Sequence, residues 1–116
     1  MNDILDIEAL IADADSEFPA LFQLFGGYFH EDWRADYTQP GAALAAFTAE
    51  APPEAVREAA AELERLLGAG LDDAVLSRLL DAGFACNYVP SRDGLTSTAW
   101  LGEVRAALRP PGGPAR

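Results

Sequence analysis

The chain has 116 residues, the size of one domain with a single hydrophobic core. Half of its residues are hydrophobic, 23% are charged and the net charge is −11, which is the balance of a globular protein and not of a disordered one. The acidic excess argues against direct binding of nucleic acid or of an anionic membrane, because both need a basic surface. It suits a basic partner instead.

The first residues carry acidic side chains and no basic one, which is unlike a signal peptide. No run of residues approaches the roughly 18 apolar residues of a membrane-spanning helix. The single cysteine, Cys86, has no partner for an internal disulfide. Together these features predict a cytoplasmic protein.

Helix-forming residues dominate, whereas Val, Ile and Thr are sparse, so the sequence predicts an all-α fold. We expect one compact domain of five or six short helices. The first helix covers residues 3–14, in which isoleucines recur on one face. The second begins at Pro19, and the aromatic residues within 22–33 mark the centre of the core. The pair Gly26-Gly27 should weaken, bend or end this helix.

Residues 34–39 look like a loop before a helix that opens at Pro40. The pair Pro52-Pro53 closes that helix and starts another, and residues 54–67 carry an amphipathic stripe that makes this the strongest helix prediction.

Asp72 has the place of an N-cap for the next helix, and Gly83 that of a left-handed residue after its end. Residues 84–90 are apolar and extended in character, but a lone strand needs a partner and no second good strand is evident. Thr96 or Ser97 caps the last helix.

His30, Glu31, Asp32 and Asp36 form the one cluster that suggests a metal or acid–base site. A zinc site needs several His and Cys ligands at set spacing, and this chain has one His and one Cys. Adjacent residues also diverge by about 100° on a helix and do not converge on one ion. A polar turn explains the cluster better, so we predict no metal and no cofactor.

Cys86 has no evident activating partner, since His30 is the only histidine, and it is interpreted as a small buried residue. The sequence motifs of serine hydrolases, phosphate-binding loops and zinc proteases are absent. We therefore predict no catalytic residue and no enzyme, and an enzyme is the weakest alternative because no nucleophile–base pair can be assembled.

Residues 1–36 hold nine acidic side chains and one basic one, Arg34. They form either a solvated surface that favours solubility or a negative patch that steers a basic partner. Aromatic residues at helical spacing are usually core, but an exposed one would be a binding anchor. The predicted partner contacts are Asp13, Asp15, Glu17, Glu31, Asp32 and Asp36, with Trp33 or Tyr37 as anchors.

The stretch FPALFQLFGGYFHEDWRADY, from Phe18 to Tyr37, resembles the opening motif of small immunity proteins from bacterial contact-dependent growth inhibition systems. The later segments EAPPEAVREAAAELERLL, LLDAGFACNYVP and TAWLGEVRAAL agree with it, so the resemblance extends to Leu108. Its most specific part is FGGYFHEDW.

The resemblance implies a helical immunity domain over residues 18–108, with an acidic helix, 1–17, before it and a disordered Pro/Gly tail, 109–116, after it. It also implies tight, stoichiometric binding to the C-terminal domain of one cognate exported toxin, often a nuclease, which protects the producing cell. It supplies no catalytic residue. The alternative is a non-catalytic adaptor or regulatory module that uses the same helical surface.

Overall fold

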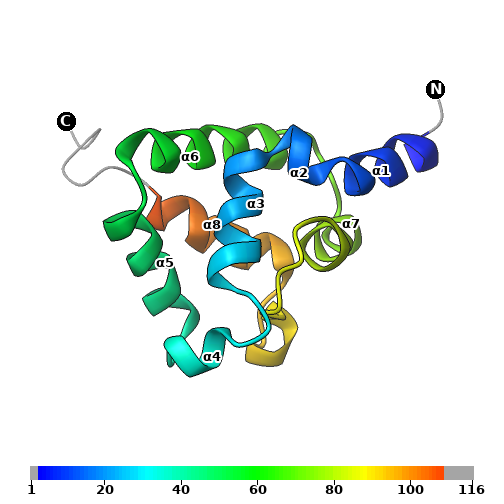
Figure 1. Cartoon of the computed structure of the whole chain (residues 1–116). Coiled ribbons are helices and arrows are strands. Elements are labelled where there is room, and N and C mark those ends of the chain that lie inside the picture. Colours follow the sequence, from blue (N-terminus) through cyan, green and yellow to red (C-terminus); the bar gives the residue numbers. More distant parts are fainter. Residues whose placement is uncertain (1–2, 109–116) are drawn as a thin grey trace.

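The computed structural model describes residues 3–108, and this part of the chain is all-α and forms one compact unit, as predicted (Figure 1). Within it lie eight α-helices instead of five or six, because two of them, α2 and α4, are four-residue turns. A π-helical turn, η1 (Leu79–Gly83), follows α7, and a 3-10 turn, η2 (Pro90–Asp93), precedes α8. The helices are α1 (Asp3–Ala12), α2 (Ala14–Glu17), α3 (Pro19–Tyr28), α4 (Trp33–Asp36), α5 (Pro40–Glu50), α6 (Pro53–Leu67), α7 (Asp73–Arg78) and α8 (Ser97–Ala107).

Local signals set the starts of the longer helices, and these predictions are confirmed. The Asp72 carboxylate accepts the backbone N–H of Val75 at 3.0 Å and caps α7. The Thr96 hydroxyl does the same for the N–H of Ala99 at 2.9 Å and caps α8. Prolines occupy the first turn of α3, α5 and α6, where the missing N–H costs nothing: Pro19, Pro40 and Pro53.

Helix α3 runs through the middle of the molecule, with α6 across one end, α5 and α7 on its two sides and α8 behind it (Figure 1). Aromatic rings join α3 to α8: the Trp100 ring centroid lies 5.6 Å from that of Phe25 and 5.3 Å from that of Phe29. Tyr88 closes the cluster at 4.8 Å from Trp100. All four side chains are buried, which confirms the aromatic run as the centre of the core.

The pair Gly26-Gly27 does not end α3, which continues to Tyr28. A Cβ atom at Gly26 would lie 3.2 Å from the carbonyl oxygen of Phe84, so this glycine permits a close approach of the chain segment after η1. This packing contact gives a reason for a glycine at position 26.

The prediction for Gly83 is wrong. Gly83 lies inside η1, and the left-handed backbone occurs two residues later at Ala85, with φ of 55°. A Cβ atom at Gly83 would lie 2.9 Å from Cδ1 of Leu79 and 3.1 Å from Cβ of Ala14. The glycine therefore permits the close packing of η1 against α1 and α2.

The predicted loop 34–39 begins inside α4, because the backbone N–H of Tyr37 bonds to the carbonyl of Trp33 at 2.8 Å. The predicted first helix, residues 3–14, is interrupted at Asp13, and Ala14, the first residue of α2, is fully buried. In each case a single helical turn places one side chain in the core, Ala14 in α2 and Trp33 in α4.

Residues 84–90 contain no strand. The backbone N–H of Asn87 bonds to the carbonyl of Phe29, the residue after α3, at 2.8 Å. The N–H of Cys86 bonds to the carbonyl of Leu80 in η1 at 2.8 Å, so this segment makes single hydrogen bonds and no strand ladder. None of the helices in residues 3–108 is long and apolar enough to span a membrane. The predicted tail, 109–116, lies outside the described residues.

Candidate functional site

The six predicted acidic contacts are all exposed, but they form two groups and not one. Figure 1 places α2 and α4 at opposite ends of α3, which has ten residues and thus spans about 15 Å. This separation was not evident from the sequence, because both groups lie within the first 36 residues. The α2 acidic group is Asp13, Asp15 and Glu17, and the α4 acidic group is Glu31, Asp32 and Asp36.

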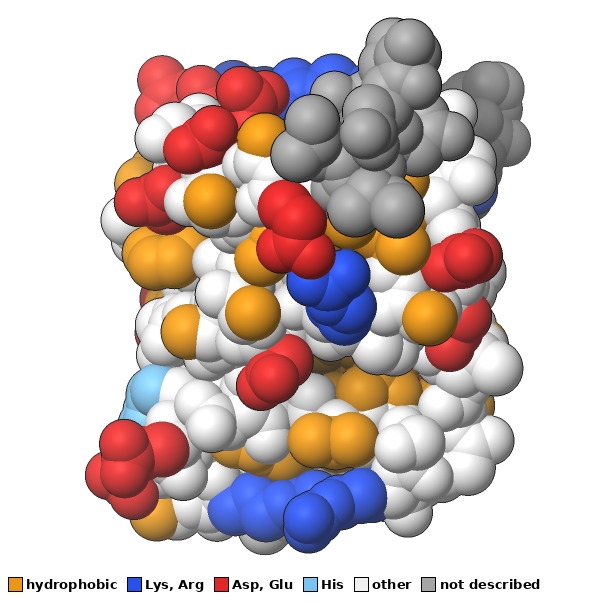
Figure 2. Space-filling view, turned by 90° about the vertical axis from the view of Figure 1, so that its right-hand side faces the viewer, with side chains coloured by type: hydrophobic (Ala, Val, Ile, Leu, Met, Phe, Trp, Pro, Cys, Tyr) orange, Lys and Arg blue, Asp and Glu red, His pale blue; other side chains and the backbone are white. Residues whose placement is uncertain are grey.

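The remaining surface carries both signs of charge. Figure 2 shows the side on which α1 and α7 lie, where red acidic and blue basic side chains both occur from the upper to the lower edge. On these helices Arg78 pairs with Glu8 at 2.6 Å. Between α6 and α8, Arg105 pairs with Glu64 at 2.5 Å. Within residues 3–108 no arginine forms an ion pair with a member of either acidic group.

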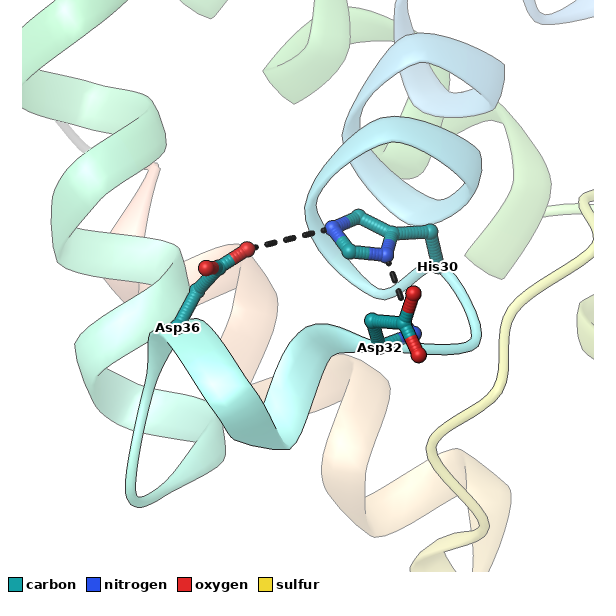
Figure 3. Close-up of polar contacts among 3 residues, drawn as sticks. All are labelled: His30, Asp32 and Asp36. Atoms are coloured by element: carbon teal, nitrogen blue, oxygen red, sulfur yellow. Dashed lines mark hydrogen bonds and ion pairs between the residues drawn. The ribbon is translucent and has the colours of Figure 1, made fainter.

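His30 organises the turn between α3 and α4 (Figure 3). Its Nδ1 accepts the backbone N–H of Asp32 at 3.0 Å, and its Nε2 lies 3.3 Å from Oδ2 of Asp36. The proton of the neutral ring is therefore on Nε2, where it can be donated to the carboxylate. The imidazole links the two ends of the turn and leaves the Asp32 carboxylate free to point outward.

The described residues contain no group of three or more His, Cys, Asp or Glu that could hold a metal ion. Cys86 is buried, and its Sγ lies 3.7 Å from the carbonyl oxygen of Tyr88. Burial raises the pKa of the Cys86 thiol to about 12, so the thiol stays protonated near neutral pH. A thiolate nucleophile is not available at this position.

Trp33 is not an exposed anchor, and that prediction is wrong. Its side chain is 2% exposed, and its ring lies 5.4 Å from Phe29 and 5.7 Å from Tyr88, measured between centroids. The guanidinium of Arg34 covers its outer side, 4.4 Å from the ring centroid. The large apolar ring is buried in the core because α4 folds back against α3 and residues 84–90.

Tyr37, the other predicted anchor, is half-buried and joins a surface pair that the sequence did not indicate. Its ring stacks on that of Tyr28, with centroids 6.5 Å apart and planes at 26°. Tyr28 packs edge-on against Phe47 and donates its hydroxyl to Oε1 of Glu50 at 3.0 Å. Burial and this carboxylate raise the pKa of Tyr28. Phe47 and Glu50 therefore hold Tyr28 in place, and Tyr28 holds Tyr37. Such a rigid aromatic pair is suited to a contact surface.

A groove opens beside this pair, between α3 and the junction of α5 with α6, and encloses about 450 Å³. We call it the α3–α5 groove. No sequence pattern could identify it, because its residues come from three helices and are separated by up to 39 positions in the chain. Its walls include Ala20, Gln23, Tyr28, Glu50, Pro52 and Glu58.

Comparison with known proteins gives a consistent result. The family model described as CdiI immunity protein matches residues 17–108. A chain of the crystal structure of the CdiA-CT/CdiI complex from Y. kristensenii 33638 superposes with a TM-score of 0.76 at 26% sequence identity, over 80% of this chain and 99% of that chain. No curated protein matches.

The family match covers most of the chain, and it contains both the aromatic core and the α4 acidic group. The structural likeness extends over nearly the whole of the Y. kristensenii chain, so the two proteins share their architecture and not one motif alone. On these grounds the chain belongs to the CdiI immunity protein family.

Proposed function

We propose that this protein binds and neutralises the C-terminal domain of a cognate CdiA toxin by forming a 1:1 complex, without catalysis, in the cytoplasm of the producing cell. The observation that carries the proposal is the family match over residues 17–108. The likeness to a chain of a CdiA-CT/CdiI complex supports it, because that protein was crystallised together with a toxin domain.

The charge of the chain supports a basic toxin domain as the partner. With a net charge of −11, the protein attracts a positively charged surface from a distance and accelerates docking. A nuclease has such a surface, because Arg and Lys side chains line the cleft that binds substrate phosphates. Acidic side chains of the immunity protein would occupy this cleft in place of the phosphates.

The α4 acidic group is the better supported contact region. It lies beside Tyr37, whose ring is held by Tyr28, so charge and a rigid aromatic surface occur together there. Among the described residues, the α2 acidic group has no stacked pair of half-buried rings like Tyr28 and Tyr37. We therefore expect the α4 group to contribute to affinity and the α2 group to contribute mainly to the rate of encounter.

Calorimetry tests the proposal with the toxin domain encoded immediately upstream of this gene. We expect 1:1 binding with a dissociation constant on the order of nanomolar, weakened by added salt because the attraction is electrostatic. Absence of binding would refute the proposed function. Tight binding that is insensitive to salt would retain the function and exclude an acidic interface.

Two matched triple variants locate the interface, since each removes three negative charges. One is Glu31→Gln, Asp32→Asn and Asp36→Asn, and the other is Asp13→Asn, Asp15→Asn and Glu17→Gln. The α4 triple should raise the dissociation constant by about 100-fold and the α2 triple by only a few-fold. Equal effects of the two triples would refute the assignment of the α4 group.

A further inference from the structure

The α3–α5 groove combines three features that suit one kind of ligand group. Glu50 and Glu58 place two carboxylates on its walls, and no basic residue lines it. The half-buried ring of Tyr28 forms part of the same wall. The hydroxyl of Tyr28 donates to Oε1 of Glu50, which holds that carboxylate in place at the rim.

A guanidinium group matches this arrangement in charge and in shape. It pairs with carboxylates through two parallel N–H donors, and its flat face stacks on aromatic rings. The volume of about 450 Å³ accommodates the long apolar stem of such a side chain. The apolar walls, which include Ala20 and Pro52, would contact that stem.

Another groove in the described part of the chain carries less net negative charge, because an arginine lines it beside two aspartates. It encloses about 430 Å³ between α7 and residues 86–97. Its Arg78 is paired with Glu8, and the carboxylate of its Asp73 accepts hydrogen bonds from the backbone N–H and the hydroxyl of Thr98. Asp81 is its remaining charged residue, so this groove offers one further carboxylate beside an arginine, whereas the α3–α5 groove offers two carboxylates and no basic residue.

The α3–α5 groove adjoins the predicted contact region, because Tyr28 lines the groove and stacks on Tyr37. The hydroxyl of Tyr28 donates to Glu50, and Asp36 directly precedes Tyr37 in the chain, so a carboxylate accompanies each ring of the pair. A protein that covers the α4 acidic group and Tyr37 thus extends over the groove. The standard interface of about 800 Å² per partner is broad enough for both.

We infer that the α3–α5 groove receives a basic side chain of the toxin domain, with the guanidinium of an arginine between Glu50, Glu58 and the ring of Tyr28. This inference rests on the proposed function, because the toxin domain supplies the side chain. The α4 acidic group steers and orients the partner, and the groove gives the complex a specific anchor.

The test measures the affinity of the upstream-encoded toxin domain for Glu50→Gln, for Glu58→Gln and for a matched control, Glu54→Gln. Glu54 is exposed in the first turn of α6, carries the same charge and does not line the groove. Each groove variant should weaken binding by about tenfold or more, and the control by about twofold or less. Thermal unfolding of each variant verifies that the fold is retained.

The ring is tested separately with Tyr28→Phe and Tyr28→Leu. The phenylalanine keeps the aromatic face but loses the hydroxyl that holds Glu50, so it should weaken binding by about twofold, whereas the leucine removes the face as well and should weaken binding by about fivefold.

The outcomes separate this inference from the proposed function. If the wild type binds tightly and Glu50→Gln, Glu58→Gln and Glu54→Gln behave alike, the groove is not the anchor and the immunity function stands. If the wild type does not bind, the proposed function fails and the groove inference fails with it.

Discussion

The carboxylate of Glu62 on α6 accepts the backbone N–H of Leu21 on α3 at 2.9 Å. Its second oxygen accepts the N–H of Ala20 at 3.2 Å. Helix α3 begins after Phe18, which has no side-chain oxygen, so a residue 41 positions away supplies the missing cap. Glu62 is 9% exposed and is the one charged residue among the buried side chains of residues 7–108. It thus fixes the central helix to its neighbour.

Replacing Glu62 should destabilise the fold. The substitution Glu62→Ala leaves two N–H groups without acceptors in a buried position, and we expect a loss of about 2–4 kcal/mol in the free energy of unfolding. Urea unfolding measures this. The matched control is Glu64→Ala on the same helix, which loses only an exposed ion pair with Arg105 and should cost less than about 1 kcal/mol. If the two variants lose the same free energy of unfolding, the hydrogen bonds from Ala20 and Leu21 to Glu62 do not stabilise the fold.

Two glycine-to-alanine substitutions should change the stability of the protein in opposite directions. Gly83→Ala brings a Cβ atom to 2.9 Å from Cδ1 of Leu79 and should destabilise the protein by about 1–3 kcal/mol. Gly102→Ala, inside α8, meets nothing within 4 Å and should stabilise it by up to about 1 kcal/mol. Thermal melting compares the two variants. A stabilising Gly83→Ala would contradict the close packing of η1 against α2.

Stability should fall at alkaline pH. Burial raises the pKa of Cys86 to about 12 from an ordinary value of 9.0, so the folded state favours the protonated thiol. This contribution is complete below pH 9 and is lost as the pH rises from there toward 12. Burial and Asp93 also raise the pKa of Tyr88 above its ordinary value of 10.0, which adds to the loss at higher pH.

The measurement is the free energy of unfolding in denaturant at a series of pH values above neutral. In Cys86→Ala the decline near pH 9 to 10 should be shallower by up to about 1.4 kcal/mol per pH unit, because one titrating group is gone. A wild-type profile that stays flat through this range would contradict the buried, protonated thiol.

Substitution of Trp33 should mainly lower stability, whereas substitution of Tyr37 should mainly weaken toxin binding. Trp33→Ala removes a buried ring and should cost about 3–5 kcal/mol of stability. Tyr37→Ala removes a half-buried ring at the surface, so it should cost about 1 kcal/mol or less of stability while weakening toxin binding by about tenfold. Unfolding curves and calorimetry on both variants provide the comparison. Wild-type affinity in a folded Tyr37→Ala protein would exclude Tyr37 as an anchor.

Much of the architecture was determined by short-range signals in the sequence. Prolines at helix starts, the caps Asp72 and Thr96, and the helix-forming composition act within one turn of the chain, so they predict helices without knowledge of the fold. The aromatic run of α3 was a sound guide to the core, because so large an apolar area must be buried somewhere. These signals predicted the all-α class.

The tertiary structure alone decided which of these residues face the solvent and which surfaces come together. Trp33 and Tyr37 are four positions apart, yet one is in the core and the other is half-buried at the surface, because α4 ends at Asp36 and Tyr37 has an extended backbone. Glu62 looks like any solvated glutamate of an amphipathic helix until α3 is placed beside it. The α3–α5 groove draws its walls from three helices. Burial and proximity depend on how distant segments pack, and local sequence preferences carry no information about that packing.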